Sequence, residues 1–334
     1  MSTNTSINIS AIKENIINKF NLSPESALDI KIDKTFTNNR SSITPISILI
    51  DKKRVIHLIE KKFKSQSNEP YMYELLQEYG INIPNVYHIN DSRYILIEDI
   101  SYHYESLGDW DEDGKEYLRD SYTYVVESLA VFHSTFWESK TIFQKIDLPW
   151  FLKNYNNYYA HLEYLRRDLD NFKLSKIGEE YMQYFDFELA YDFMQNKYNN
   201  LLKTRFQHGR SITMIHGDLN ASNVWVLKKS PNAINSFNVK FIDLEAIRIG
   251  LPTDDLVMLL TFHFAKTKEI ALPLLEKYYN KLSETVYNYS FNDLLTDFRY
   301  SLMETVFFAI KLINDGIPAY EMLNGFIKTY KTFF

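Results

Sequence analysis

Two polar residues stand five positions apart in the stretch from Met214 to Val226, and both could take part in phosphoryl transfer. Asp218 offers a carboxylate that could accept the proton of an attacking hydroxyl, and Asn223 offers a hard oxygen ligand for a magnesium ion. Asp243 ends the next apolar strand, where a carboxylate can reach a metal without being buried unpaired. The pattern predicts Asp218 as catalytic base and Asn223 and Asp243 as Mg²⁺ ligands.

The same residues have two other interpretations. The tripeptide His216-Gly217-Asp218, taken alone, could be a turn in which Asp218 caps a helix or bonds the backbone. A metal-dependent hydrolase built on His216 and Asp218 would need a second histidine at ligand spacing, which the sequence lacks. The additional presence of Asn223 and Asp243 favours phosphoryl transfer over both.

The elements that must position these residues fall into two groups. The first group is α+β, with an amphipathic helix, a β-meander, a second helix and two further strands. These elements are expected at Ile9–Phe20, Ala27–Phe63, Glu69–Gly80, Val86–Ile89 and Tyr94–Ile97.

After Ile100 the apolar residues recur at helical spacing. Long helices are expected at Tyr117–Trp137, at Glu179–Leu202 and over most of the chain from Asp254 onward. Only Asn223–Leu227 and Val239–Ile242 have the pattern of later strands. The sequence therefore predicts a β-rich front lobe, a mainly helical back lobe and one hairpin within the latter.

Composition limits the classes of protein. With 334 residues, of which 45% are hydrophobic and 24% charged, the chain suits a soluble protein of two lobes. The absence of cysteine leaves oxygen and nitrogen as the possible metal ligands. The polar start has no signal-peptide pattern, and no window reaches the ~18 to 20 apolar residues of a membrane span. We expect a cytoplasmic protein without a membrane partner, and the net charge of -6 argues against a nucleic-acid partner.

The catalytic stretch resembles the aminoglycoside phosphotransferase and choline kinase superfamily, the small-molecule branch of the protein-kinase-like fold. His216-Gly217-Asp218, followed by Asn223 after four intervening residues, is the pattern of that branch. Protein kinases carry Arg in place of Gly217 and Lys in place of Asn220. The resemblance extends from about Ile30 to Leu260 and implies an α+β, bilobal fold. It implies a nucleotide-binding lobe at 1–97, a hinge at 98–101 and a helical lobe with the acceptor site at 102–334.

The resemblance also implies how the nucleotide is held. A front-lobe lysine should pair with a glutamate on the following helix and steady the nucleotide phosphates. Lys61 and Glu69 are the preferred pair, with Lys62 and Glu74 as the alternatives, because only one of two neighbouring lysines on a strand can face the site. In the hinge, the backbone around Glu98 and Ile100 would bind the adenine edge.

Other matches concern the fold more than the chemistry. His133, in a Leu-Ala-x-x-His segment, is expected to pack or cap, and Asp255 is expected to begin a helix and brace the catalytic loop. No glycine precedes Gly80, so the stretch Thr35–Ser42 would have to cover the phosphates in place of a Gly-rich loop. Leu and Glu follow Asp243 where protein kinases have Phe-Gly, which favours a site that needs no activation step.

The implied activity is transfer of the γ-phosphoryl group of ATP, or of GTP, with Mg²⁺, to a hydroxyl of a small molecule such as an amino sugar or amino alcohol. A nucleotide-binding regulatory pseudokinase is the alternative, and the protein is expected to be a monomer or homodimer. The acidic run from Asp109 to Asp113 could attract a cationic acceptor, or be a solvated loop. A set of aromatic residues could form acceptor-binding walls, or simply core, at Trp137, Trp150, Phe151, Tyr155, Tyr158, Tyr159 and Tyr164.

Overall fold

The computed structural model describes residues 9–109, 115–145, 155–228, 238–261 and 267–334. The chain divides into two compact units that are not continuous in sequence. The first unit comprises Met1–Glu105, Trp225–Ser230 and Lys240–Glu245, and the second comprises Ser106–Val224, Pro231–Val239 and Ala246–Phe334. Among the described helices, none combines the length and the hydrophobicity that crossing a bilayer requires.

The first unit is built on an antiparallel sheet with the strand order β1-β3-β4-β6-β5, and β2 pairs with the outer part of β3. Its strands are β1 (Leu28–Ile32), β2 (Phe36–Thr37), β3 (Ser41–Ile50), β4 (Arg54–Phe63), β5 (Val86–Ile89) and β6 (Tyr94–Glu98). The predicted meander and the two strands after it are present.

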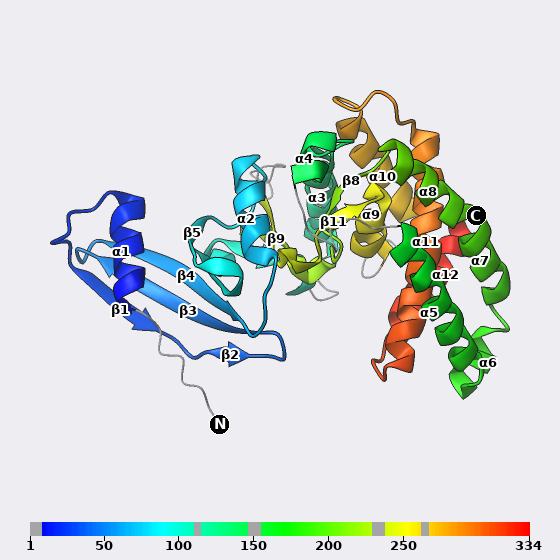
Figure 1. Cartoon of the computed structure of the whole chain (residues 1–334), viewed down its shortest axis with the longest axis horizontal. Coiled ribbons are helices and arrows are strands. Elements are labelled where there is room, and N and C mark those ends of the chain that lie inside the picture. The colour runs from blue at the N-terminus through cyan, green and yellow to red at the C-terminus, as the bar shows by residue number, and fades with distance from the viewer. Residues whose placement is uncertain (1–8, 110–114, 146–154, 229–237, 262–266) are drawn as a thin grey trace. The chain divides into compact units, whose positions relative to one another are not determined.

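Helix α1 (Ile9–Phe20) lies across one face of this sheet, as Figure 1 shows. Ile12 and Ile16 stand four residues apart, one helical turn, and both are buried against the sheet. Their partners from the strands are Ile46, Ile48, Ile50, Ile56, Leu58 and Leu96. The opposite side chains of β4 are thereby left for the other face of the sheet, because neighbours along a strand point in opposite directions.

Helix α2 (Glu69–Glu78) begins with Pro70 in its first turn, where the missing N–H costs no hydrogen bond. It ends just before Gly80, whose φ of +70° stops the helix in the left-handed region. A second, three-stranded sheet follows the order β10-β9-β7. Its strands are β7 (Tyr104–Ser106), β9 (Val224–Leu227) and β10 (Val239–Phe241).

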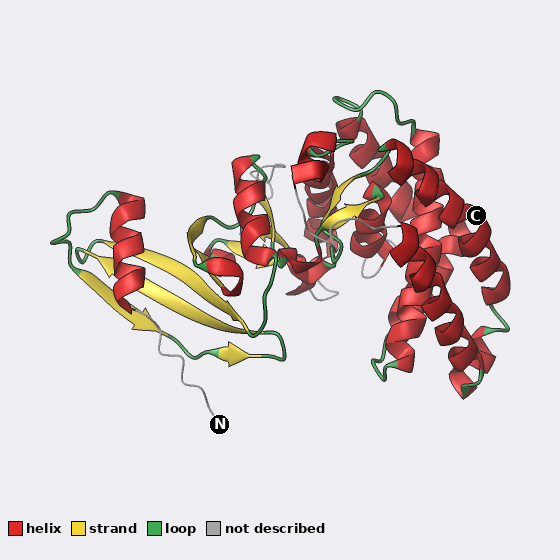
Figure 2. Ribbon diagram, viewed as in Figure 1, coloured by secondary structure: helices red, strands yellow, loops and turns green. Residues whose placement is uncertain are grey.

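The second unit is mainly helical, as the helices coloured red in Figure 2 show. Its helices are α3 (Lys115–Thr135), α4 (Lys140–Lys145), α5 (Tyr155–Lys173), α6 (Lys176–Tyr181), α7 (Phe187–Phe193), α8 (Asn199–His208), α9 (Pro252–Thr261), α10 (Lys268–Leu282), α11 (Phe291–Asn314) and α12 (Tyr320–Phe333). Helix α11 packs against α5, α9 and α12, and buries Phe298, Leu302 and Val306. A capping box of Ser290 and Asp293 fixes where it begins.

Two predictions for the chain after Ile100 were wrong. The continuous helix expected at Glu179–Leu202 is interrupted between α6 and α7, because Asp186 accepts a hydrogen bond from the Leu189 N–H and starts a new helix. A π-helical turn, Met194–Tyr198, then joins α7 to α8.

The expectation of only two later strands also failed. Besides β9 and β10, the chain forms β7 and the antiparallel pair β8 (Thr213–Ile215) and β11 (Arg248–Gly250). Each of these three strands has three residues, which is too short for an alternating pattern to show in the sequence.

Candidate functional site

Lys61 and Glu69 form the ion pair that the sequence predicts. Nζ of Lys61, on β4, lies 2.6 Å from Oε2 of Glu69, on α2. Lys62 pairs instead with Glu60, at 3.2 Å, because adjacent side chains of β4 point to opposite faces of the sheet. Glu74, the alternative to Glu69, is exposed.

Asp243 shares the same lysine. Its Oδ1 accepts a hydrogen bond of 2.9 Å from Nζ of Lys61. Asp243 follows β10 with a φ of +60°, a left-handed conformation that aspartate adopts more readily than most residues. The Glu69 side chain is 1% exposed and that of Asp243 is 43% exposed. The Lys61 ammonium group therefore contacts two carboxylates. Glu69 is buried and anchors the lysine, whereas Asp243 is exposed and can be reached by a ligand.

The charges of this cluster are unbalanced. Burial raises the pKa of Glu69 to about 7, and the attraction of Lys61 offsets only part of that effect. Burial lowers the pKa of Lys61, but the two carboxylates outweigh it and hold that pKa above its ordinary value. Burial, with the negative charges of Glu69 and Asp243, raises the pKa of Tyr73 on α2 well above its usual value. Two carboxylates face one ammonium group, so an added cation would be stabilised here.

The segment predicted as the hinge is anchored by a buried lysine. Oε2 of Glu98 accepts hydrogen bonds from Nδ2 of Asn85 at 2.8 Å and from Nζ of Lys240 at 2.9 Å. Burial raises the pKa of Glu98, but the hydrogen bonds from Lys240 and Asn85, together with the charge of Lys240, outweigh it and hold that pKa below its usual range. Lys240 lies on β10, only three residues before Asp243. The end of β6 and the strand that leads to Asp243 are thus tied together.

Some backbone groups of this segment already have partners. The N–H of Glu98 donates to the Asn85 carbonyl at 2.8 Å, and the Ile100 carbonyl accepts from the His103 N–H at 3.0 Å. The Glu98 N–H and the Ile100 carbonyl are therefore engaged within the protein.

Asp218 and Asn223 lie in the second unit, on the loop between β8 and β9. Nδ2 of Asn223 donates to the Asp218 carbonyl at 2.8 Å, and Nδ2 of Asn220 lies 3.2 Å from Oδ1 of Asp218. The first bond uses the amide nitrogen of Asn223, so its carbonyl oxygen is the atom that a hard cation would contact. A single short loop thus positions the candidate base and one candidate metal ligand.

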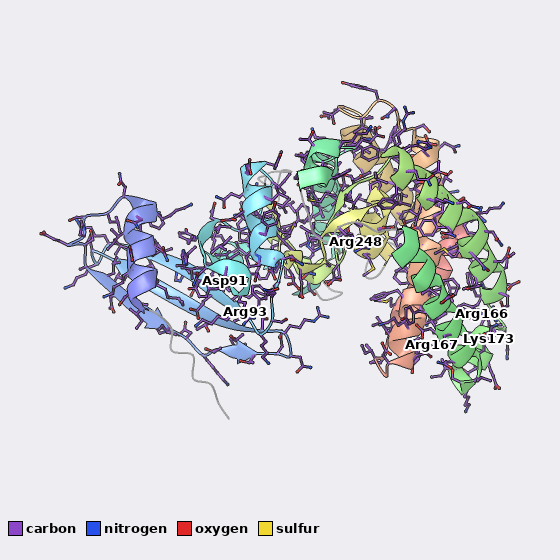
Figure 3. The ribbon with its side chains drawn as sticks, in the orientation of Figure 1. Asp91, Arg93, Arg166, Arg167, Lys173 and Arg248 are labelled. Carbon is purple, nitrogen blue, oxygen red and sulfur yellow. The ribbon has the colours of Figure 1, made fainter. Side chains whose placement is uncertain are left out.

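Gly217 allows this loop to approach its neighbours. Its φ is +82°, and a Cβ at this position would lie 2.2 Å from the Ala246 carbonyl oxygen and 2.2 Å from Nη1 of Arg248. Nη1 of Arg248, a residue labelled in Figure 3, donates a hydrogen bond of 3.0 Å to the Gly217 carbonyl. No side chain fits here, which accounts physically for glycine immediately before Asp218.

A buried carboxylate braces the same loop from α9. Oδ2 of Asp255 accepts from the His216 N–H at 2.7 Å, and Oδ1 accepts from the Gly217 N–H at 2.8 Å. Nε2 of His133, on α3, lies 3.1 Å from Oδ2 of Asp255. Burial raises the pKa of Asp255, but its hydrogen bond with His133, the nearby His216 and the hydrogen bond from the Gly217 N–H together outweigh it and hold that pKa below its ordinary value. The brace expected of Asp255 is confirmed, and His133 is part of it.

The remaining predicted features are only partly visible. In the stretch Thr35–Ser42, Oδ1 of Asn38 accepts from the Ser41 N–H at 2.7 Å, so this side chain shapes the turn. Tyr164 is exposed, and Cζ of Arg167 lies 5.1 Å from the centre of its ring. The rings of Trp137 and Tyr289 pack with their centres 5.0 Å apart. Trp150, Phe151 and positions 110–113 of the acidic run lie outside the described residues, and Tyr155, Tyr158 and Tyr159 lie on α5.

The sequence model of the ecdysteroid kinase-like family matches residues 67–291. The chain belongs to this family. The matched segment contains Glu69, Asp218, Asn223 and Asp243, whereas Lys61 lies before it. The resemblance drawn from the catalytic stretch is confirmed, because the ecdysteroid kinase-like model covers that stretch.

Two solved structures resemble this chain over almost its whole length. A Plasmodium vivax ethanolamine kinase matches with a TM-score of 0.52 and 12% identity, over 98% of this chain and 90% of its own. The GDP complex of a mutant aminoglycoside 2'-phosphotransferase-IIIa matches with a TM-score of 0.52 and 14% identity, over 96% of this chain and 97% of its own. The predicted α+β, bilobal protein-kinase-like fold is confirmed. A search of curated proteins finds no match.

Asn223 of the second unit and Asp243 of the first each offer an oxygen atom of the kind that Mg²⁺ prefers. Within the described ranges, no group of three or more histidine and carboxylate side chains forms a metal cage.

Sequence reasoning missed three residues of this region. Lys240 stands in a short apolar strand, where a lysine is normally taken to face solvent. Arg248 and Tyr73 have no motif of their own. For Lys240, a signal was available in its position three residues before Asp243, on the strand that must reach the site.

Proposed function

We propose that the chain is an ATP-dependent kinase that transfers the γ-phosphoryl group to a hydroxyl of a small molecule. The observation that carries this proposal is the position of Lys61 between buried Glu69 and exposed Asp243. A lysine fixed in this way, beside a carboxylate that can take Mg²⁺, matches what a nucleotide polyphosphate requires. Membership of the ecdysteroid kinase-like family supports the proposal.

In the proposed reaction each residue has one task. Lys61 draws negative charge from the nucleotide phosphates, and Asn223 and Asp243 would hold a magnesium ion, which would supply further positive charge beside those phosphates. Asp218 accepts the proton of the acceptor hydroxyl as its oxygen attacks the γ-phosphorus, and ADP leaves. Asp255 keeps the loop of Asp218 in place through two backbone hydrogen bonds.

We propose the segment 98–101 as the hinge between a nucleotide lobe, residues 1–97, and an acceptor lobe, residues 102–334. The Glu98 carbonyl and the Ile100 N–H would bind the purine edge. ATP is the proposed donor and GTP the alternative, because the phosphotransferase relative was solved with GDP. We propose an amino sugar, amino alcohol or similar compound as acceptor, and a cytoplasmic monomer or homodimer as the working form.

The first experiment measures Mg²⁺-dependent nucleotide binding and nucleotide consumption, with a panel of amino sugars, amino alcohols, nucleosides and sugars as acceptors. We expect ATP to bind more tightly with Mg²⁺ and to be consumed when one class of acceptor is added. ATP binding without turnover on any acceptor would favour the regulatory pseudokinase.

Lys61 and Lys62 supply a matched pair of variants. Both lysines pair with a glutamate that is almost fully buried, so Lys61→Met and Lys62→Met should destabilise the protein by similar amounts. Only Lys61 also contacts Asp243. We expect Lys61→Met to weaken MgATP binding at least about tenfold, a loss of ~1.4 kcal/mol, and Lys62→Met to leave it nearly unchanged. Equal effects of the two variants would remove Lys61 from its role.

A further inference from the structure

A buried tyrosine of the helical unit has no part in the chemistry described so far. Tyr278 lies on α10, which packs against α3, and its side chain is fully buried. Its hydroxyl lies 2.7 Å from Nδ1 of His133 on α3. His133 is also fully buried, and its other ring nitrogen faces Asp255. The hydroxyl is therefore two hydrogen bonds away from the carboxylate that braces the catalytic loop.

The direction of these hydrogen bonds follows from the state of Asp255. Its pKa is held low, so at neutral pH it is a carboxylate and only accepts. Nε2 of His133 must then carry the hydrogen that faces Oδ2 of Asp255. In the neutral form of His133, to which the inference applies, the second nitrogen is an acceptor, so Nδ1 receives the hydrogen of the Tyr278 hydroxyl. Burial raises the pKa of Tyr278 well above its usual value, so this hydroxyl keeps its proton.

We propose that Tyr278 is a positioning residue of the phosphoryl-transfer site, which acts by holding His133 in the tautomer whose Nε2–H donates to Asp255. The inference rests on the proposed function for its effect on turnover, but the tautomer itself does not depend on substrate. Tyr278 touches neither nucleotide nor acceptor in this scheme.

The other tautomer would disturb the brace. With the hydrogen on Nδ1, the Nε2 lone pair would face Oδ2 of Asp255, and two acceptors would meet in a buried site. Asp255 would then lose a donor and shift from the N–H groups of His216 and Gly217, which it now holds at 2.7 and 2.8 Å. Asp218 follows Gly217 directly in the chain, so the position of the base would change with the brace.

The chain offers a matched control for the loss of the hydroxyl. Tyr289 is also buried, and its hydroxyl donates to Oδ2 of Asp297 at 2.7 Å. Asp297 also pairs with Arg205, and Tyr289 packs against Trp137. Tyr278→Phe and Tyr289→Phe thus each remove one buried hydroxyl and one hydrogen bond of the same length.

The experiment has three readouts on the full chain. The ¹⁵N signals of His133 give its tautomer, amide hydrogen exchange gives the protection of the His216 and Gly217 N–H groups, and steady-state kinetics give kcat and the KM for MgATP. In the wild type we expect the Nε2–H tautomer. In Tyr278→Phe we expect about tenfold faster exchange at the two amides and about tenfold lower kcat, with an unchanged KM. Tyr289→Phe should change none of the three.

Several results would overturn the inference. A wild-type His133 with its hydrogen on Nδ1 would do so without any variant, even if Tyr278→Phe fails to fold. Equal changes in both variants would show a loss of stability and no positioning role. Lack of turnover in the wild type would reject the proposed function only, because the tautomer and the amide exchange would still test the role of Tyr278.

Discussion

Gly217 offers the sharpest test of the geometry around the candidate base, through the substitution Gly217→Ala. A methyl group at this position would lie 2.2 Å from the Ala246 carbonyl oxygen and 2.2 Å from Nη1 of Arg248. The first neighbour is backbone and can yield only if the chain moves. The second is a side chain that already donates to the Gly217 carbonyl and would have to leave.

The expected loss of stability has three parts. Alanine at a φ of +82° costs about 1–2 kcal/mol relative to glycine, as for any residue with a Cβ in the left-handed region. Loss of the Arg248 hydrogen bond costs about 1 kcal/mol. Relief of the clash with the Ala246 carbonyl costs about 1–3 kcal/mol, the usual range for overpacking. Gly217→Ala should therefore lower the free energy of unfolding by roughly 3–6 kcal/mol.

Gly80→Ala is the matched control. Gly80 has a φ of +70°, but a Cβ there would meet no atom within 4 Å. This variant should carry the conformational cost alone, about 1–2 kcal/mol. Urea unfolding followed by tryptophan fluorescence measures both variants, and the comparison requires equal m-values. Gly217→Ala should also lose most of its turnover, while Gly80→Ala should retain it.

The double variant Gly217→Ala with Arg248→Ala separates the two clashes. Removal of the arginine opens the space occupied by Nη1, so part of the lost stability should return. If Gly217→Ala is no less stable than Gly80→Ala, the close approach of Ala246 and Arg248 to the loop is refuted, and with it the reason given for glycine before Asp218.

Three further predictions concern the charged residues. Asp218→Asn should lower turnover by roughly 10²–10⁴-fold with MgATP affinity unchanged, since a base acts after the nucleotide is bound; near-normal turnover would remove Asp218 from the reaction. Asn tolerates a left-handed backbone, so Asp243→Asn should keep the local fold. It should nevertheless abolish the dependence of ATP affinity on Mg²⁺ in a titration, and an unchanged titration would contradict the role of Asp243 as a ligand. The pKa of Glu69 is raised from 4.5 to about 7, so the folded state holds more protons than the unfolded state between these values. Stability should then fall as pH rises through that window, by up to ~1.4 kcal/mol per pH unit, in the wild type but not in Glu69→Gln; parallel curves for both proteins would refute the shift.

The sequence predicted those parts of the site that a short stretch can encode. The five-residue spacing of Asp218 and Asn223 and the end of an apolar strand at Asp243 were enough to group these residues by chemistry. Alternation along a strand showed that only one of Lys61 and Lys62 can face the site. Which of the two faces Glu69 depends on how β4 pairs with β3 and β6.

Other features lay beyond local reasoning. The capping role of Asp186, which divides a helical pattern into α6 and α7, depends on a single side-chain hydrogen bond that hydrophobic periodicity does not register. The buried position of Lys240 requires Glu98 from a distant segment as its partner. Tyr278 also needs a partner from a distant segment. Its sequence pattern is that of an ordinary apolar residue of a helix, and only the fold brings its hydroxyl to His133.

The first unit takes its last segments from far along the chain, and this affects how the protein can be made. Lys240–Glu245 belongs to that unit, although it follows more than a hundred residues of the second unit. A fragment that stopped at Glu105 would leave Lys61 without Asp243 and Glu98 without Lys240. The amino-terminal unit is therefore not an excisable module. During synthesis on the ribosome the ion pairs of Lys240 and Asp243 can close only after these residues have emerged, by which time most of the helical unit has already been translated.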